Sequence, residues 1–326
     1  MTEPLPAAVL ARPSTGSRGA PFTWNVDPPR EGYGTSISHH GEILQGVFEG
    51  GTGEVRPALV TLPRFDVRSE VTFTLREGAE LTVQPAWKVK AKRAAELTLA
   101  VLGREGAGGS LRVSDAIPVG HGFGSSSSDV VATIRATAAS VGVVLPADVV
   151  ARLAVRAEAA SDSVMLEGRT VLFAQREGTV VEDLGPSLPA LEVVGFSTDE
   201  GRGPVLTLDL PVPAYASYEL KLFRLLRGAL RRAVADQSAE LLGRVATASA
   251  RINQRYLPVP RFDLLESLVA RCGAVGLQVA HSGTVAGLLF DRGAPGVAER
   301  VAVARRALDE LGLASWQFHT GSWMAS

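Results

Sequence analysis

The sequence predicts an α+β protein of two domains, and three observations support this prediction. The chain has 326 residues, which is long for one hydrophobic core and short for three. Short β-branched segments separated by glycine or proline turns fill residues 43–84, and amphipathic segments of helical period follow them. Beyond Pro186 and Pro189 the pattern starts again, as alternating strands and helices.

Each expected element has a local reason. The segments read as strands are β-branched or partly alternating, and those read as helices are rich in alanine and leucine at helical spacing. In the first part of the chain we expect strands at 43–48, 56–62, 67–75, 80–84 and 111–116, helices at 87–102, 125–140 and 147–160, and a hairpin of 170–174 with 178–183.

After residue 188 a second series follows. We expect strands at 191–197, 275–280, 285–290 and 315–319, and helices at 215–235, 238–252, 262–271 and 296–311. The domain prediction is therefore an N-terminal arm at 1–32, a first domain at 33–188 and a second at 189–326. The arm is interrupted by proline and glycine and holds no apolar run of the length of a signal peptide or membrane span.

Composition excludes some classes of function. Hydrophobic residues make up 46% and charged residues 21% of the chain, so a sizeable core can form. The net charge of −1 gives no overall attraction to nucleic acid or anionic lipid, so a phosphate site has to be local. The one cysteine, Cys272, lies in an apolar segment and allows no intrachain disulfide. We expect it to be buried, and we expect a cytoplasmic protein with no nucleic-acid or membrane partner; a homodimer is left open.

The most informative segment runs from Ile117 to Asp129 and reads IPVGHGFGSSSSD. It stands between an expected strand and an expected helix. Alternating glycines let the backbone approach a ligand closely, and the helix start offers free N–H groups and a positive dipole end. The segment lacks the Gly-Lys-Ser/Thr of a Walker A loop. It predicts an anion site suited to phosphate, with Ser125 as the helix N-cap.

This segment resembles the second motif of the GHMP kinases, Pro-x-x-x-Gly-Leu-Gly-Ser-Ser-Ala. The resemblance implies the two-domain GHMP fold, with an N-terminal domain like ribosomal protein S5 and a C-terminal ferredoxin-like α/β sandwich. It also implies ATP and Mg²⁺, with Ser126 near the metal. The residues expected to hold the ATP phosphates are Gly120, Gly122, Phe123, Gly124, Ser125, Ser126 and Ser127.

Two further motifs stand at the distances that this family has. Residues 38–46, SHHGEILQG, are similar to the opening of the bacterial L-threonine kinases of cobalamin synthesis, which implies that His39, His40 and Glu42 contact the acceptor. Residues 276–287 contain a His-Ser-Gly-Thr segment similar to the same group. That likeness implies that Ser282, Gly283 and Thr284 also bind substrate.

Phosphoryl transfer needs a metal ligand and a group that orients or deprotonates the attacking hydroxyl. GHMP kinases take both from acids after the second motif, and here Glu158 and Asp162 stand four residues apart. On a helix this spacing would place both on one face. We therefore assign Asp162 as the catalytic acid–base residue and Glu158, with Ser126, as metal ligands; two solvated acids at a helix end are the alternative.

Other candidates have plain structural alternatives. Lys88, Lys90 and Lys92 reach either the phosphates or, as we expect, water on a solvated helix face. Trp87 is expected to be a core aromatic residue rather than an adenine-stacking one. The five histidines are too far apart in sequence to indicate a zinc site.

Three functions agree with these observations. The first is an ATP-dependent kinase for a small hydroxylated amino acid such as L-threonine or homoserine. The second is a catalytically silent sensor of the same fold that binds ATP and a metabolite. The third is an isoprenoid-pathway kinase or ATP-dependent decarboxylase. The Gly-Glu-Ile-Leu-Gln-Gly segment favours the first.

Overall fold

The computed structural model describes residues 30–50, 53–114, 124–199 and 215–320. The elements of the first half of the chain are β1 (Glu31–Glu49), β2 (Val55–Glu77), β3 (Leu81–Gln84), α1 (Val89–Val101), β4 (Ala107–Val113), α2 (Ser125–Ala139), α3 (Ala147–Glu158), β5 (Thr170–Ala174) and β6 (Thr179–Gly185). Those of the second half are β7 (Leu191–Ser197), α4 (Ser217–Ala235), α5 (Ala239–Asn253), α6 (Phe262–Arg271), β8 (Gly276–Val279), β9 (Val285–Asp291), α7 (Val297–Glu310) and β10 (Ser315–Thr320).

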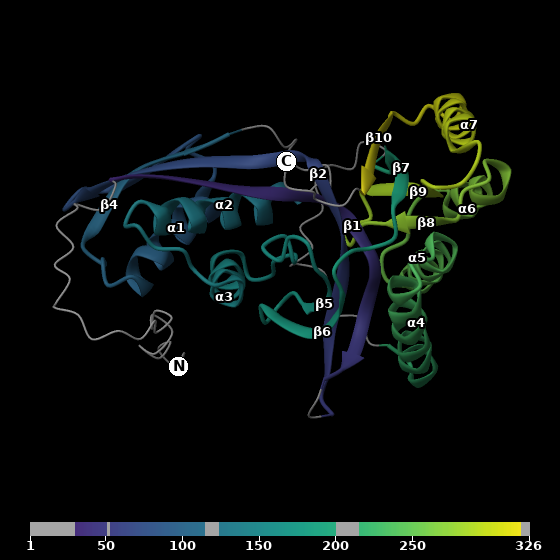
Figure 1. Cartoon of the computed structure of the whole chain (residues 1–326), viewed down its shortest axis with the longest axis horizontal. Coiled ribbons are helices and arrows are strands. Elements are labelled where there is room, and N and C mark those ends of the chain that lie inside the picture. Colours follow the sequence, from purple (N-terminus) through teal and green to yellow (C-terminus); the bar gives the residue numbers. More distant parts are fainter. Residues whose placement is uncertain (1–29, 51–52, 115–123, 200–214, 321–326) are drawn as a thin grey trace, which may run out of the picture.

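The strands form one mixed sheet in the order β10-β7-β9-β8-β1-β2-β4-β3, and β5 and β6 branch from β2. β1 and β2 are long antiparallel partners that run from the region of α1, α2 and α3 to that of α4 and α5 (Figure 1). β1 meets β8 at one register pair, Glu42 with Val279. The first-half and second-half strands therefore join at Glu42, inside the segment that resembles the family's first motif.

The pairing of β1 with β2 is irregular in the same segment of β1. The β1–β2 register shifts between Ile37 and Ser38, again between His39 and Glu42, and again between Glu42 and Leu44. Bulges of this kind bend a strand and re-aim its side chains, and they are frequent beside functional sites.

Apolar side chains on both sides of this junction form the core. One cluster packs α2 and α3 against β1 and β5 through residues such as Ile37, Ile134, Leu153 and Phe173. Another packs α4 and α5 against β1, β2 and β7 through Leu44, Phe48, Phe223, Leu230 and Leu242. A third holds β7, β8 and β9 to α6 and α7 through Phe196, Leu268, Leu277, Leu288 and Leu308. Among the described residues, no helix is both long and apolar enough to span a membrane.

Most elements lie where the sequence predicted them, and the differences have physical causes. The predicted strands 56–62 and 67–75 are one continuous strand, β2. β1 begins at Glu31, well before the predicted residue 43. Its early part contains Gly32 and Gly34, where an added Cβ would overlap the backbone of α2. These glycines allow close helix–strand packing rather than marking a loop.

The expected N-terminal arm, residues 1–32, overlaps the first strand of the sheet. Residues 1–29 of the expected arm lie outside the described residues, and Glu31 and Gly32 belong to β1. We retain the boundary near residue 188, in the segment between β6 and β7. Cys272 is buried and unpaired with another cysteine, as expected.

Candidate active site

The N-terminus of α2 has no side-chain cap in the described part of the chain and no acid in its first turn, so an anion can approach it. Its N-cap position is Gly124, at φ 63°, and no side chain of the described residues caps it, so the expectation that Ser125 is the cap is wrong. The first turn of a helix carries unpaired N–H groups and a positive dipole end. No acidic residue stands in this first turn. Gly120, Gly122 and Phe123, which were also expected to bind phosphate, lie outside the described residues.

A polar chain leads from α2 to the end of α3. Ser126 Oγ donates a hydrogen bond of 2.7 Å to Glu158 Oε2, and Lys90 Nζ donates one of 3.2 Å to Ser126 Oγ. The second carboxylate oxygen, Glu158 Oε1, is buried and has no hydrogen-bond partner in the described part of the chain. Burial raises the pKa of Glu158, and the hydrogen bond from Ser126 and the charge of Lys90 oppose that rise.

This oxygen pair fits the Mg²⁺ that the family implies. Mg²⁺ prefers hard oxygen ligands and is usually held by one or two carboxylates together with substrate phosphates. Glu158 offers a buried oxygen without a hydrogen-bond partner, and Ser126 offers a hydroxyl beside it. The two predicted metal ligands therefore lie together, at the edge of the α2 N-terminus.

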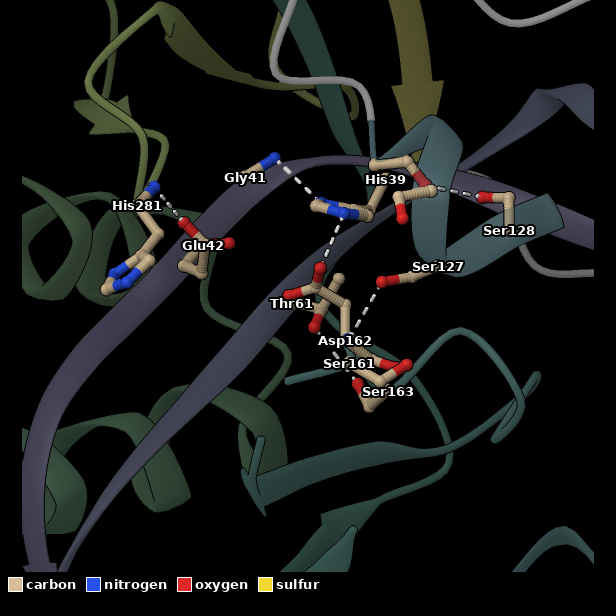
Figure 2. A network of polar contacts seen from close by, with 12 residues as sticks. His39, Gly41, Glu42, Thr61, Ser127, Ser128, Ser161, Asp162, Ser163 and His281 are labelled. Atoms are coloured by element: carbon tan, nitrogen blue, oxygen red, sulfur yellow. Dashed lines mark hydrogen bonds and ion pairs between the residues drawn. The ribbon is translucent and has the colours of Figure 1, made fainter. Parts of the chain in front are cut away.

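Asp162 lies just beyond α3, where a turn brings it under α2 (Figure 2). α3 ends at Glu158 because Ala159 takes the left-handed conformation, at φ 69°. The predicted helix 147–160 is thus too long, and Glu158 and Asp162 do not share a helix face. Asp162 N donates to Ser127 Oγ at 3.3 Å, which joins the carboxylate-bearing turn to the serine-rich start of α2.

His39 holds the Asp162 carboxylate. Its Nε2 lies 2.9 Å from Asp162 Oδ2, and Gly41 N donates to its Nδ1 at 3.1 Å (Figure 2). Burial would raise the pKa of Asp162, but the charge and hydrogen bond of His39 lower it below its usual value. Asp162 is therefore ionised at neutral pH. Gly124 packs against the same imidazole ring, so an added Cβ there would overlap it.

Two opposing effects act on the charge of His39. Burial lowers its pKa, but the charge and hydrogen bond of Asp162, with the charges of Glu42 and Glu158, raise it to about 9. The N–H of Gly41, which points at Nδ1, opposes a second proton on the ring. In either charge state Nε2 carries a proton that faces Asp162.

Glu42 is the third member of the His39–Asp162 cluster and connects it to His281. Its Oε2 accepts a hydrogen bond of 2.5 Å from His281 N, and His281 Nδ1 lies 2.8 Å from Gln45 Oε1. Burial and the charge of Asp162 raise the pKa of Glu42 to about 8, although His39 acts against this. One ligand atom from each of His39, Glu42 and Asp162 lies within 4.8 Å of the other two.

The remaining predicted substrate residues divide into two groups. His40 contacts other residues than His39 does. It is fully buried, contacts Gln278 Oε1 at 2.9 Å, and packs against Trp316 and Phe318. Burial lowers its pKa to about 4. His40 is therefore a core residue that the structure does not bring together with His39.

The 282–284 turn directly follows His281, whose N–H donates to Glu42, and it forms hydrogen bonds within itself and to Thr198. Ser282 Oγ and Thr284 Oγ1 are 2.6 Å apart, and Thr198 Oγ1 donates to Gly283 O at 2.5 Å. Sequence reasoning did not select His281 and Gln45, although both stand inside quoted motifs. Their mutual contact joins segments 236 residues apart, which no local pattern reveals.

The expected solvated lysine face is wrong for Lys88. Lys88 is 6% exposed, and its Nζ lies 2.5 Å from Asp129 Oδ2, while Ser69 Oγ donates to Asp129 Oδ1 at 2.6 Å. This buried pair ties the start of α1 to α2 and β2. Trp87, expected in the core, is 54% exposed and its ring lies 4.4 Å from Lys88 Nζ.

Known proteins share sequence and fold with this chain. Residues 89–166 match the family model of the GHMP kinases N terminal domain. Over 183 residues the chain is 32% identical to an L-threonine kinase of Citrobacter freundii; the match covers 55% of this chain and 62% of that protein. The chain thus spans less than two thirds of that relative's length.

Solved structures share the whole fold at low identity. A homoserine kinase from Cytophaga hutchinsonii superposes with a TM-score of 0.63 at 18% identity, covering 93% of this chain and 98% of that one. A mevalonate diphosphate decarboxylase from Staphylococcus aureus superposes with a TM-score of 0.67 at 13% identity, covering 90% and 97%. The chain therefore carries a GHMP kinase N-terminal domain at residues 89–166, within the fold that the GHMP kinases share.

Proposed function

We propose that this protein is an ATP- and Mg²⁺-dependent kinase that phosphorylates the hydroxyl of a small amino acid such as L-threonine or L-homoserine. The observation that carries the proposal is the contact between Asp162 N and Ser127 Oγ. It sets an ionised carboxylate directly beside a helix start suited to phosphate. A phosphoryl donor and an acceptor hydroxyl would meet at this point.

Each part of the site has one role in phosphoryl transfer. The α2 N-terminus, from Gly124 to Ser127, binds the phosphates through its N–H groups. Ser126 and Glu158 would hold Mg²⁺, which neutralises charge that develops on the phosphates. Asp162 accepts a hydrogen bond from the acceptor hydroxyl and keeps its oxygen in line with the γ-phosphorus. As the new O–P bond forms and the bond to the β-phosphate oxygen breaks, the hydroxyl proton passes to Asp162 and ADP leaves.

His39 acts through Asp162. Its Nε2–H donates to Oδ2, which leaves Oδ1 for the acceptor and fixes the plane of the carboxylate. A carboxylate held in this way keeps its lone pairs directed at one place, which is the positioning that phosphoryl transfer depends on.

The charge around the acceptor position favours an amino group on the substrate. Glu42 and Asp162 are two acids within one small cluster, and Glu42 is 4% exposed. An ammonium group beside Glu42 would offset the cost of ionising a buried carboxyl, whereas a carboxylate or diphosphate placed there would increase that cost. The likeness to L-threonine kinase supports the same class of acceptor.

The test is a phosphoryl-transfer assay on the purified chain with Mg·ATP and, separately, L-threonine, L-homoserine and (R)-mevalonate. We expect ADP and a phosphomonoester, identified by ³¹P NMR and mass, from at least one amino acid and not from mevalonate. Transfer to mevalonate alone would assign an isoprenoid-type activity. Tight ATP binding without transfer to any acceptor in a broad panel of hydroxylated amino acids would favour a sensor.

A further inference from the structure

Lys88, Lys90 and Lys92 stand at every second position at the start of α1, and their surroundings differ. Lys88 is buried in its pair with Asp129. Lys92, one turn further, lies 3.8 Å from the exposed Glu80. Lys90 is exposed, and its ammonium group reaches across to α2, 3.2 Å from Ser126 Oγ.

The position of Lys90 coincides with the place expected for a metal. Ser126, its hydrogen-bond partner, donates in turn to Glu158. The charge of Lys90 also favours the ionised form of the buried Glu158 carboxyl. In the nucleotide-free protein, Lys90 thus supplies positive charge to the same two side chains that would bind Mg²⁺.

A metal ion and this ammonium group cannot both be close to Glu158 without repelling each other. The lysine side chain is a flexible four-carbon stem with a mobile charged tip. Phosphate oxygens bound at the α2 N-terminus would lie beside Ser126, within reach of the Lys90 ammonium group. The movement required is a change of side-chain rotamer at an exposed residue.

We propose that Lys90 is a phosphate-binding residue with two positions: it neutralises Glu158 in the free protein and turns onto the nucleotide phosphates when a metal ion takes its place. This inference rests on the proposed function, because it uses the same phosphate and metal sites. It assigns to α1 a direct part in binding the nucleotide.

The two positions predict effects of opposite sign in a Lys90→Met variant, which keeps the stem and removes the charge. Without nucleotide, Mn²⁺ should bind about threefold to tenfold more tightly, because a repelling charge near Glu158 is gone. At saturating Mg²⁺, where the metal occupies the Glu158 site in both proteins, ADP should bind about tenfold or more weakly, as expected when one charge-assisted hydrogen bond is lost. Mn²⁺ binding is measured by EPR of the free ion and ADP binding by calorimetry.

Lys92→Met is the matched control, since it removes the same charge two residues further along α1, from a side chain that lies near Glu80 instead of Ser126. Both of its affinities should stay within about twofold of wild type. Loss of both affinities in Lys90→Met would mean that Lys90 only supports the local structure, and unchanged affinities would mean that it has no role; either result overturns the inference. Failure of the wild type itself to bind ADP would instead overturn the proposed function.

Discussion

Replacing Gly124 by alanine tests whether the α2 start and the His39–Asp162 pair form one unit. The new Cβ would lie about 1 Å closer to Nε2 and Cδ2 of His39 than the 3.0 Å minimum separation that real Cβ atoms show. The clash is with a buried ring, 4% exposed, so relieving it displaces the ring from its present contacts. Residue 124 also has φ 63°, which costs an L-residue about 1–2 kcal/mol.

These two costs can be separated within the same helix region. Gly142, which follows α2, has φ 71° and nothing within 4 Å of an added Cβ. Gly142→Ala should therefore lose only about 1–2 kcal/mol of unfolding free energy and keep nucleotide affinity and kcat. Gly124→Ala should lose at least as much stability. It should also move the His39 ring by about 1 Å, lengthening its 2.9 Å contact with Asp162 beyond hydrogen-bond range.

The expected functional result is a fall in kcat of about 10²-fold or more for Gly124→Ala, since a displacement of 1 Å at a positioned group has that effect. Urea unfolding gives the stability of both variants, and turnover with ADP calorimetry gives their function. If Gly124→Ala matches Gly142→Ala in all three measurements, the α2 start does not position His39 and the reasoning fails.

Two further predictions concern the acids and hydroxyls around this pair. Glu42→Gln should raise KM for the acceptor about tenfold or more, with KM for ATP unchanged, because a charged partner of the acceptor is lost. Since the pKa of Glu42 is raised to about 8, its ionisation destabilises the folded state. The stability of the wild type relative to Glu42→Gln should therefore fall as pH rises from about 5 to 8; urea unfolding at several pH values that shows the opposite trend would contradict the assignment. Ser126→Ala should weaken Mg·ATP binding about tenfold while changing metal-free ADP binding much less; equal losses in both titrations would remove Ser126 from the metal site.

The sequence predicts where many helices and strands begin, because these positions depend on neighbouring residues. α2, β7, α5 and α6 begin within one residue of their expected starts, at positions set by glycine, serine and proline. The early part of β1 was missed because Gly32 and Gly34 are typical of loops, and only the position of α2 shows why a strand needs them.

The site was predicted in part, for a similar reason. Motif resemblance selected Ser126, Glu158 and Asp162, which do lie together. The different surroundings of His39 and His40 depend on the irregular pairing that follows His39, which the sequence did not reveal. Nothing in the local sequence indicated the contact of His39 with Asp162, because 123 residues separate them and the turn at Ala159 directs the carboxylate.

The Lys88 interpretation failed for a related reason. A lysine in a helical pattern is normally solvated, and burial is tolerated only when a charged partner is buried with it. That partner, Asp129, stands 41 residues away on α2. Its pairing with Lys88 and Ser69 depends on how α1, α2 and β2 pack, which periodicity alone does not specify.

The most direct test of the proposed function is the single-turnover rate of γ-phosphate transfer to L-threonine or L-homoserine by wild type and Asp162→Asn. ATP affinity is measured on the same preparations. The amide keeps the size of the side chain and loses its charge and basicity. We expect Asp162→Asn to bind ATP like the wild type and to transfer phosphate roughly 10²–10⁴-fold more slowly, the range for loss of a positioned base. An undiminished rate in Asp162→Asn would contradict the account, because the carboxylate beside the α2 N-terminus would then have no part in the transfer.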